Sequence, residues 1–320
     1  MRILVTGGSG FIGTNLIDQF MSDGHSLLNI DIQRPVNEMH ESLWRKVDIN
    51  DLSRFSAAVI EFNPEYIVHL AARTDLNGSK LDDYSVNILG VENLMIIVRQ
   101  LKSLKKVLIT SSMLVCELGY SPIDESDFKP STVYGHSKVL TEKIVRKNPP
   151  KCDWLILRPT SIWGPWFGAP YRNFFELILS RKYFHISTKG CNKTYGYVQN
   201  TTYQIGQLLF QDTQNQKAKV FYLGDYIATN IEIWANQIGD ASGVKIRRLP
   251  FFAVKILAVF GDLLGYFSID FPMSSFRLKN MTRNNVFDLS DLQKLAPDLP
   301  INQRVGIERT LEWIQEYGEK

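Results

Sequence analysis

The chain has 320 residues, is 44% hydrophobic, and carries 36 Lys and Arg against 33 Asp and Glu, a formal net charge of +3. This length and composition allow a sizeable core in one large or two modest domains. A charge balance so close to neutral excludes the basic field that binding a phosphate backbone requires. We therefore expect no nucleic-acid partner.

Three cysteines, Cys116, Cys152 and Cys191, are widely scattered along the chain. An odd number at this spacing fits neither a disulfide framework nor a metal cluster, so we expect a reducing compartment and no metal site. The pattern of a β-strand begins at Arg2, which leaves no room for a signal peptide. The protein is therefore expected to be cytoplasmic.

The N-terminal half alternates short β-branched apolar runs with longer segments of helical periodicity. This alternation predicts a parallel sheet with helices on both faces, which is a doubly wound, Rossmann-type α/β fold. Helices are predicted over 11–22, after the first strand, and over 86–101, before the fifth. The predicted strands are Arg2–Thr6, Ser26–Asp31, Trp44–Asp48, Tyr66–Leu70, Lys106–Thr110 and Trp154–Arg158.

The alternation becomes irregular after Pro159, because glycines and prolines crowd into residues 164–170. A strand pattern at Val220–Leu223, preceded by a helical segment at Gln204–Phe210, indicates that the sheet takes back a later part of the chain. The predicted division is a sheet domain over residues 1–165, to which the chain returns around 195–230, and a smaller, mainly C-terminal domain over 166–320.

One apolar stretch in the C-terminal half runs from Phe251 to Phe267. Lys255 and Asp262 interrupt it, so its uncharged runs are shorter than the roughly 18 residues that a spanning helix needs. We expect no membrane span. We also expect this segment to pack within the C-terminal half rather than to lie on a membrane surface.

A glycine-rich loop, Thr6–Gly13, follows the first predicted strand and opens the first helix. Glycines are needed at such a turn because a β-carbon would block the tight bend or the approach of a pyrophosphate to the amides of the helix N-terminus. The spacing fits a GxGxxG pattern from Gly8 and a GxxGxxG pattern from Gly7 equally well. The loop therefore predicts a dinucleotide site without deciding which type of turn it forms.

Asp31 ends the second predicted strand, eighteen residues after Gly13. A carboxylate at this place accepts hydrogen bonds from an adenosine ribose and repels a 2′-phosphate, which favours NAD over NADP. Arg34 lies close by and is able in principle to meet a 2′-phosphate, so NADP stays open as an alternative.

Tyr134 and Lys138 stand one turn apart on one face of a predicted helix. A free tyrosine titrates at about 10, too high for a general base at neutral pH, whereas a nearby ammonium and an oxidised nicotinamide favour the phenolate. Ser111 and Ser112 follow the fifth predicted strand, at the sheet end where doubly wound folds place ligands. A serine hydroxyl, Tyr134 and Lys138 in this order predict a site for hydride transfer.

In their order and spacing these motifs resemble the extended short-chain dehydrogenases, the NAD-dependent nucleotide-sugar epimerase/dehydratase family, over nearly all of the chain. Ser112 occupies the family's catalytic serine position, and Tyr134 and Lys138 match its YxxxK motif. The resemblance implies Ser112, Tyr134 and Lys138 as catalytic residues. It also implies NAD as cofactor, held by Gly7, Gly10, Phe11, Ile12, Gly13, Asp31, Asp48, Ile49, Leu70, Ala71, Ala72, Asn87, Tyr134, Lys138 and Thr160.

Two segments of the C-terminal half, Asn173–Phe175 and Lys193–Val198, resemble those that hold the nucleotide diphosphate and its base in the family. Lys193 stands where an arginine is usual, and lysine neutralises phosphate without offering a bidentate fork. Arg283 is a further candidate for a phosphate contact. The substrate contacts implied by the resemblance come from Ser112, Asn173, Lys193 and Arg277.

Two departures from the family pattern narrow the reaction. Family dehydratases carry Asp-Glu just after the catalytic hydroxyl residue, and here those positions are Met113 and Leu114, which cannot serve as acid and base for eliminating water. A further family member places a cysteine at the position of Leu114. Cys116 lies two residues later, and we interpret it as a packing residue.

These observations leave three functions open. The first is an NAD-dependent nucleotide-sugar epimerase, acting at C4 through a transient ketone, in surface polysaccharide or activated-sugar metabolism. The second is a ketoreductase or dehydrogenase that uses the same triad once, on a deoxy-ketosugar or an apolar alcohol. The third is a non-catalytic dinucleotide-binding subunit, which the retained Tyr134 and Lys138 disfavour. A homodimer is expected on general grounds.

Overall fold

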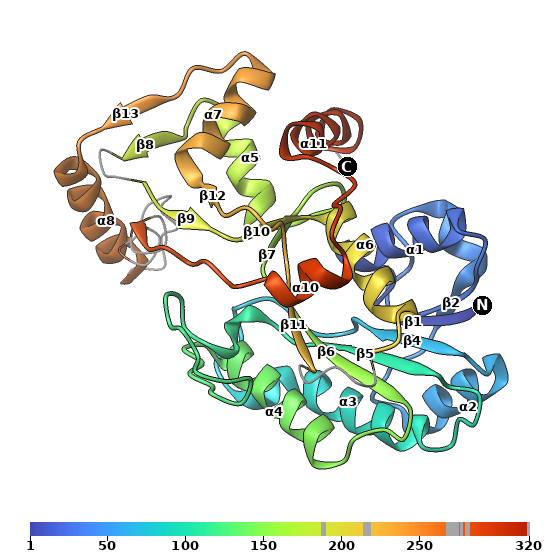
Figure 1. Ribbon diagram of the computed structural model, residues 1–320. Helices are drawn as coiled ribbons and strands as arrows, with labels where there is room; N and C mark the ends of the chain where they lie inside the picture. The colour runs from blue at the N-terminus through green and yellow to red at the C-terminus, as the bar shows by residue number, and fades with distance from the viewer. Residues whose placement is uncertain (187–189, 214–218, 267–274, 276–277, 279–281, 319–320) are drawn as a thin grey trace.

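The computed structural model describes residues 1–186, 190–213, 219–266, 275, 278 and 282–318. Its centre is a parallel sheet of β1 (Arg2–Thr6), β2 (Ser26–Asp31), β3 (Trp44–Lys46), β4 (Tyr66–His69), β5 (Lys106–Thr110), β6 (Asp153–Pro159) and β11 (Val220–Leu223). The strand order is β11-β6-β5-β4-β1-β2-β3, and every pair is parallel. The predicted doubly wound fold is confirmed (Figure 1).

Helices cover both faces of this sheet (Figure 1). One buried cluster joins the sheet to α2 (Leu52–Phe62), α3 (Ser85–Val98) and α4 (Val133–Lys147). A second cluster, on the opposite face, joins it to α1 (Phe11–Ser22), α6 (Val198–Phe210) and α10 (Ser290–Leu295). Short 3-10 helices connect these elements at η1 (Glu38–Leu43), η2 (Leu81–Tyr84) and η3 (Met113–Val115).

The rest of the described chain forms a smaller lobe beside the carboxyl ends of the strands (Figure 1). Its core is aromatic, with the rings of Trp163 and Trp234 5.3 Å apart between centroids. The lobe consists of β7 (Ser161–Trp163), α5 (Tyr171–Leu179), β8 (Phe184–Ile186), β9 (Asn192–Lys193), β10 (Tyr195–Tyr197), β12 (Thr229–Asn230), α7 (Ile231–Ser242), β13 (Arg247–Leu249), α8 (Phe251–Tyr266) and α11 (Gln303–Tyr317). Its strands pair as β10-β7, β12-β9 and β13-β8.

Helix α6 begins at Val198, six residues before the start that the sequence predicts. Its first turns carry polar side chains, which hide the apolar periodicity, yet these side chains are buried because they have partners. Asn200 donates a hydrogen bond to Asp225 at 2.8 Å, and Thr201 donates one to the carbonyl of Tyr197 at 3.2 Å. Hydrogen bonding thus extends the helix where hydrophobic patterning gives no signal.

Among the described residues, no helix is long and apolar enough to cross a membrane.

Candidate active site

The glycine loop between β1 and α1 has the shape that a pyrophosphate requires. Gly7 has a φ of 72°, and a β-carbon there would lie 2.6 Å from the amide nitrogen of Ala71. A β-carbon on Gly10 would meet only the carbonyl oxygen of Gly7, at 3.3 Å, so this side of the loop is open. Because α1 starts at Phe11, the amides of its first turn have no partner within the helix. An anionic group fits here.

Asp31 lies beside this loop, at the end of β2. Its carboxylate accepts a hydrogen bond from the Ser9 amide at 3.1 Å and one from the Gln33 amide at 2.9 Å. Burial raises the pKa of Asp31, and these backbone hydrogen bonds partly offset the effect. The carboxylate is thus held at the loop, where an adenosine ribose would follow a pyrophosphate.

The other residues predicted to meet the cofactor differ in what their side chains contact. Asp48 is exposed and accepts a hydrogen bond from the Asn50 amide at 2.9 Å, whereas Ile49 is buried in the core. Leu70, Ala71 and Ala72, just after β4, are partly buried along the same end of the sheet.

Asn87, on α3, fixes two neighbouring elements. It accepts a hydrogen bond from the Arg73 amide at 2.8 Å and donates one to the Arg73 carbonyl at 3.0 Å. It donates another to the Ser137 hydroxyl of α4 at 2.9 Å. Both ends of the amide are therefore used to hold the segment after β4 against α4, so Asn87 positions the site.

Ser112, Tyr134 and Lys138 come together at the carboxyl end of β5. Ser112 caps η3, accepting a hydrogen bond from the Leu114 amide at 3.1 Å, and its hydroxyl lies close enough to the Tyr134 phenol to lower the pKa of that group. Tyr134 and Lys138 lie on one face of α4, and all three side chains are buried. Gly135 allows this approach, since a β-carbon there would collide with the Leu114 carbonyl.

Burial sets the protonation of both groups on α4. It raises the pKa of Tyr134 to about 12, although the Ser112 hydroxyl lowers it somewhat. Burial also lowers the pKa of Lys138 to about 8, and the nearby Glu142 carboxylate opposes this. Lys138 donates a hydrogen bond to the Thr110 carbonyl at 2.9 Å, which directs its ammonium toward the end of β5. Without the cofactor, the protein's own groups therefore favour a neutral Tyr134 phenol beside a Lys138 ammonium that loses its proton more easily than a free lysine does.

The family model for the NAD dependent epimerase/dehydratase family matches residues 3–187. The chain belongs to this family. N-acetyl-alpha-D-glucosaminyl-diphospho-ditrans,octacis-undecaprenol 4-epimerase of Escherichia coli O157:H7 is 24% identical over 100% of this chain and 97% of its own. UDP-glucose 4-epimerase of Mycolicibacterium smegmatis is 30% identical over 52% of this chain and 57% of its own. The crystal structure of Thermus thermophilus UDP-glucose 4-epimerase with NAD has a TM-score of 0.73 at 20% identity, covering 99% of this chain and 100% of that one.

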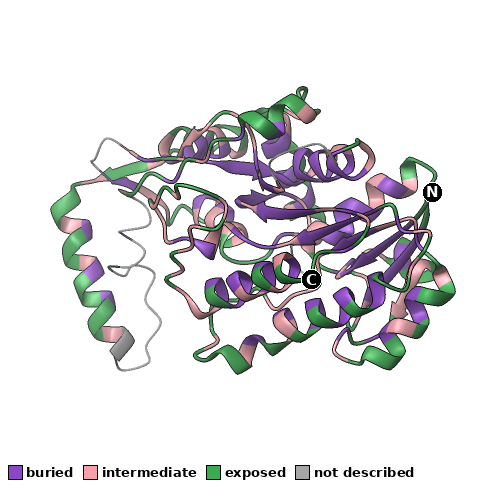
Figure 2. Cartoon of the chain, turned by 60° about the horizontal axis from the view of Figure 1, so that its bottom comes forward, coloured by how far each residue is buried: buried purple, intermediate pink, exposed green. Residues whose placement is uncertain are grey.

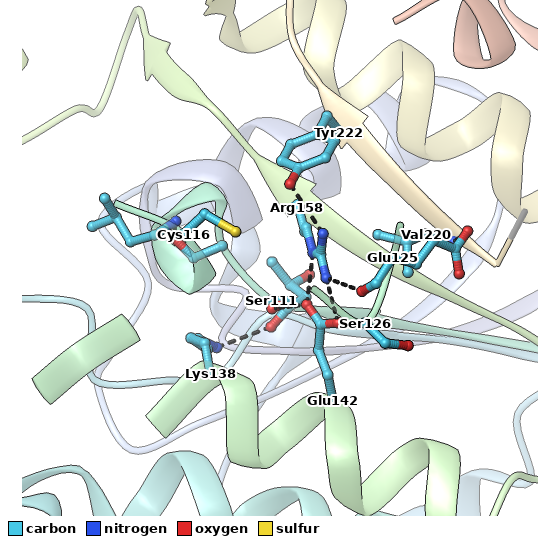
Figure 3. Close-up of polar contacts among 12 residues, drawn as sticks. Ser111, Cys116, Glu125, Ser126, Lys138, Glu142, Arg158, Val220 and Tyr222 are labelled. Carbon is cyan, nitrogen blue, oxygen red and sulfur yellow. Dashed lines mark hydrogen bonds and ion pairs between the residues drawn. The ribbon is translucent and has the colours of Figure 1, made fainter. Parts of the chain in front are cut away.

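In this NAD-dependent enzyme a buried ion pair lies close to Ser111 and Lys138 (Figure 3). Both side chains, Glu142 of α4 and Arg158 of β6, are almost fully buried. Arg158 donates to both carboxylate oxygens of Glu142, each at 2.8 Å, and Ser111 donates to the same carboxylate at 2.6 Å. The Nη1 of Arg158 donates to the Tyr222 hydroxyl at 3.0 Å, and the Nη2 that meets Glu142 also donates to the Glu125 carbonyl at 2.7 Å.

Because Glu142 binds both Arg158 and Ser111, the pair fixes α4 against β6 and against the segment after β5. Ser112 on that segment and Lys138 on α4 are thereby held in fixed positions relative to each other. The prediction from sequence missed Glu142. Its signal was its spacing, one further turn from Lys138 on the face that carries Tyr134.

The residues predicted to bind substrate are more dispersed. Thr160, which was predicted as a cofactor contact, directly follows β6 and donates its hydroxyl hydrogen bond to the Leu223 carbonyl at 2.7 Å. Asn173 is exposed in the first turn of α5. Lys193 is half-buried on β9, where burial lowers its pKa. Arg277 lies outside the described residues.

The two lobes touch beside η3. Arg283 donates a hydrogen bond to the Leu118 carbonyl at 3.5 Å, and the Gly119 amide donates one to the Asn285 side chain at 3.4 Å. Asn285 also bridges to Lys193 on β9 and contacts the Met113 sulfur at 3.7 Å. A cleft of about 430 Å³ lies along this contact, lined by Glu117, Leu118, Gly119, Tyr120, Lys129, Arg283 and Asn284.

Proposed function

We propose that this enzyme is a 4-epimerase that inverts C4 of a sugar bound through a diphosphate, as in a nucleotide sugar, during surface-polysaccharide assembly. The observation that carries the proposal is that the buried Ser112, Tyr134 and Lys138 meet at the end of β5, with the apolar Met113 and Leu114 directly after Ser112. The relative aligned over the full chain is named as a 4-epimerase of a diphosphate-linked sugar, which supports the same reaction class.

The catalytic groups suit a reversible oxidation. Tyr134 takes the proton of the C4 hydroxyl and later returns it, while the Ser112 hydroxyl holds the reacting oxygen. NAD⁺, when bound, would supply reversible hydride transfer at C4 and a positive charge that would favour the phenolate. Lys138 supplies the protein's own positive charge, because its ammonium lies on the Tyr134 face of α4.

The neighbours of Ser112 disfavour dehydration. Elimination of water needs an acid and a base beside the sugar ring, and Met113 and Leu114 provide neither. Both are partly buried in η3, beside the interlobe contact at Asn285. Because Met113 and Leu114 cannot hydrogen-bond the sugar, a keto sugar can rotate beside them and present its other face to the cofactor.

Cofactor and substrate divide between the two lobes in this proposal. Residues 1–165, with the return around 195–230, hold NAD through the glycine loop and Asp31. Residues 166–320 bind the substrate, with Asn173, Lys193 and Arg277 toward the diphosphate and its attached group. The odd number and wide scatter of the cysteines support a reducing cytoplasm, and the general frequency of paired assemblies favours a homodimer.

Purified enzyme with a catalytic amount of NAD should be screened against UDP-, GDP-, CDP- and dTDP-sugars, with the C4 epimer measured by NMR. We expect one sugar to equilibrate with its C4 epimer while no NADH accumulates. NADH formed in proportion to product would identify a dehydrogenase instead. A product that has lost one molecule of water would identify a dehydratase.

A further inference from the structure

Helix α8 lies at the far end of the smaller lobe, and many of its residues are exposed (Figure 2). Several of these residues have large apolar side chains. Phe252 is 68% exposed, Ile256 65%, Val259 60% and Leu263 57%. Their spacing of four, three and four residues places them in one stripe along the helix. We call these four residues the outer stripe of α8. A contiguous apolar stripe of this kind marks an interaction surface more often than single exposed residues do.

The opposite face of α8 explains why the helix forms without the outer stripe being covered. Val254 and Ala258 are fully buried, and they pack against Ile186 of β8 and Leu249 of β13. These contacts satisfy one apolar face of the helix. The outer stripe is a second apolar face, so packing within the lobe does not account for it.

The surroundings of the outer stripe are basic. Residues 244–264 contain four cations against the single carboxylate of Asp262. Lys245, Arg247 and Lys255 are exposed, and Arg248 forms an ion pair with Glu232 at 2.7 Å. Asp262 accepts a hydrogen bond from the Ser275 amide at 3.0 Å. An apolar stripe with Lys255 on the same helix, preceded by a segment with exposed cations, complements an anionic lipid surface.

We propose that the outer stripe of α8 docks on the surface of an anionic phospholipid bilayer. The helix has 16 residues, a length of about 24 Å, which is shorter than the roughly 30 Å of bilayer hydrocarbon. It therefore lies along the surface, with its stripe among the acyl chains and its cations at the headgroups. Resting on the proposed function, this docking brings the enzyme to a diphosphate sugar carried by a membrane lipid.

Co-sedimentation of the full-length protein with vesicles tests this docking without any substrate. The vesicles are phosphatidylcholine alone, and phosphatidylcholine with phosphatidylglycerol at about three to one. We expect wild-type protein to sediment with the mixed vesicles. The variant Ile256→Glu/Val259→Glu should bind at least about a hundredfold more weakly, because two charges replace inserted side chains.

A matched control carries the same added charge elsewhere on the lobe. Ile227 is 83% exposed and Ile233 is 57% exposed, so Ile227→Glu/Ile233→Glu changes apolar residues of comparable exposure. This variant should sediment with the mixed vesicles almost as wild type does. Circular dichroism and retained NAD binding show that each variant is folded.

The cations Arg247 and Lys255 are tested separately from the outer stripe. Each of Arg247→Ser and Lys255→Ser should weaken binding to the mixed vesicles by about fivefold at low salt. The difference between these variants and wild type should shrink in about 1 M salt, where charges are screened within a few ångströms.

Several outcomes overturn the docking. Wild-type protein that stays in the supernatant with both vesicle types contradicts it, as does equal behaviour of the stripe variant and its control. A stripe variant that converts an oligomer to a monomer in ultracentrifugation, while wild type ignores vesicles, identifies a contact between copies of the chain instead. An enzyme that epimerises a nucleotide sugar but does not sediment with either kind of vesicle refutes the membrane docking and leaves the proposed function standing.

Discussion

Two regions of the molecule are exceptions to the usual rule that charged residues are exposed and apolar residues are buried. They are the end of the sheet near Lys138 and the outer stripe of α8. At the sheet end, the charges of Glu142 and Arg158 are buried and joined by two hydrogen bonds. On α8, Ile256 and Val259 are apolar and exposed. A buried charge is tolerated only when paired, and an exposed apolar stripe is stable only at a cost in free energy. Each departure therefore indicates a place where the protein positions or meets another molecule.

The largest expected effect is a loss of turnover when a group that contacts the substrate is replaced. Tyr134→Phe keeps the ring but removes the proton, so turnover should fall by about 10²–10⁴-fold while NAD affinity stays nearly unchanged. Lys138→Met should lower both binding and turnover, whereas Ser112→Ala should mainly lower turnover. Steady-state kinetics and calorimetry check this. A Tyr134→Phe enzyme that keeps more than about a tenth of wild-type activity contradicts the assigned roles.

The next effect tests whether the buried ion pair is needed for positioning. Glu142→Gln leaves the Arg158 guanidinium buried without its counter-charge, so the free energy of unfolding should drop by about 3–5 kcal/mol. The matched change Glu176→Gln breaks an exposed ion pair with Arg172 and should cost at most about 1 kcal/mol. Urea unfolding measures both. Equal losses would mean that burial does not distinguish the two pairs.

Loss of Glu142 should also be seen in the pH dependence of turnover. The Glu142 carboxylate raises the pKa of Lys138, so its removal lowers that pKa further below about 8. The ammonium is then lost at lower pH, and the alkaline limb of the kcat profile should shift to lower pH. A destabilised but unshifted enzyme would assign Glu142 a purely structural role.

A buried histidine, His69, and an exposed one, His136, should differ in how they make stability depend on pH. Burial lowers the pKa of His69 to about 3, so below 6.5 the unfolded chain binds a proton that the folded chain does not. This group should therefore reduce stability by up to about 1.4 kcal/mol per pH unit as the pH falls from 6.5 toward 3. His69→Gln should flatten this slope, and His136→Gln, at an exposed site, should not. Identical slopes in all three proteins would refute the assignment.

The smallest expected effect concerns cofactor choice. Asp31 should make NAD bind at least about tenfold more tightly than NADP, a difference of about 1.4 kcal/mol. Asp31→Ser should narrow the gap, mainly by improving NADP binding. Calorimetric titration of both cofactors measures this, and equal affinities in the wild type would show that Asp31 does not face the ribose.

The sequence predicted the sheet well because its strands are short apolar runs separated by helices. Strands at 2–6, 26–31 and 106–110 form where expected. It did not predict the Glu142–Arg158 pair, since charged residues on a helix usually face solvent and only the fold brings α4 against β6. Residues 251–266 are apolar on two faces, so the sequence could not show that one face packs as expected while the other stays exposed.

In the proposed reaction, the hydride leaves C4 and returns to the same carbon on the other face. A nucleotide sugar carrying deuterium at C4, once the substrate is identified, tests this directly with catalytic NAD. NMR and mass spectrometry should show the C4 epimer with its deuterium retained at C4, with none transferred to solvent and no net NADH. Deuterium lost to water, or accumulated in a stoichiometric reduced cofactor, would contradict epimerisation through a transient 4-ketone.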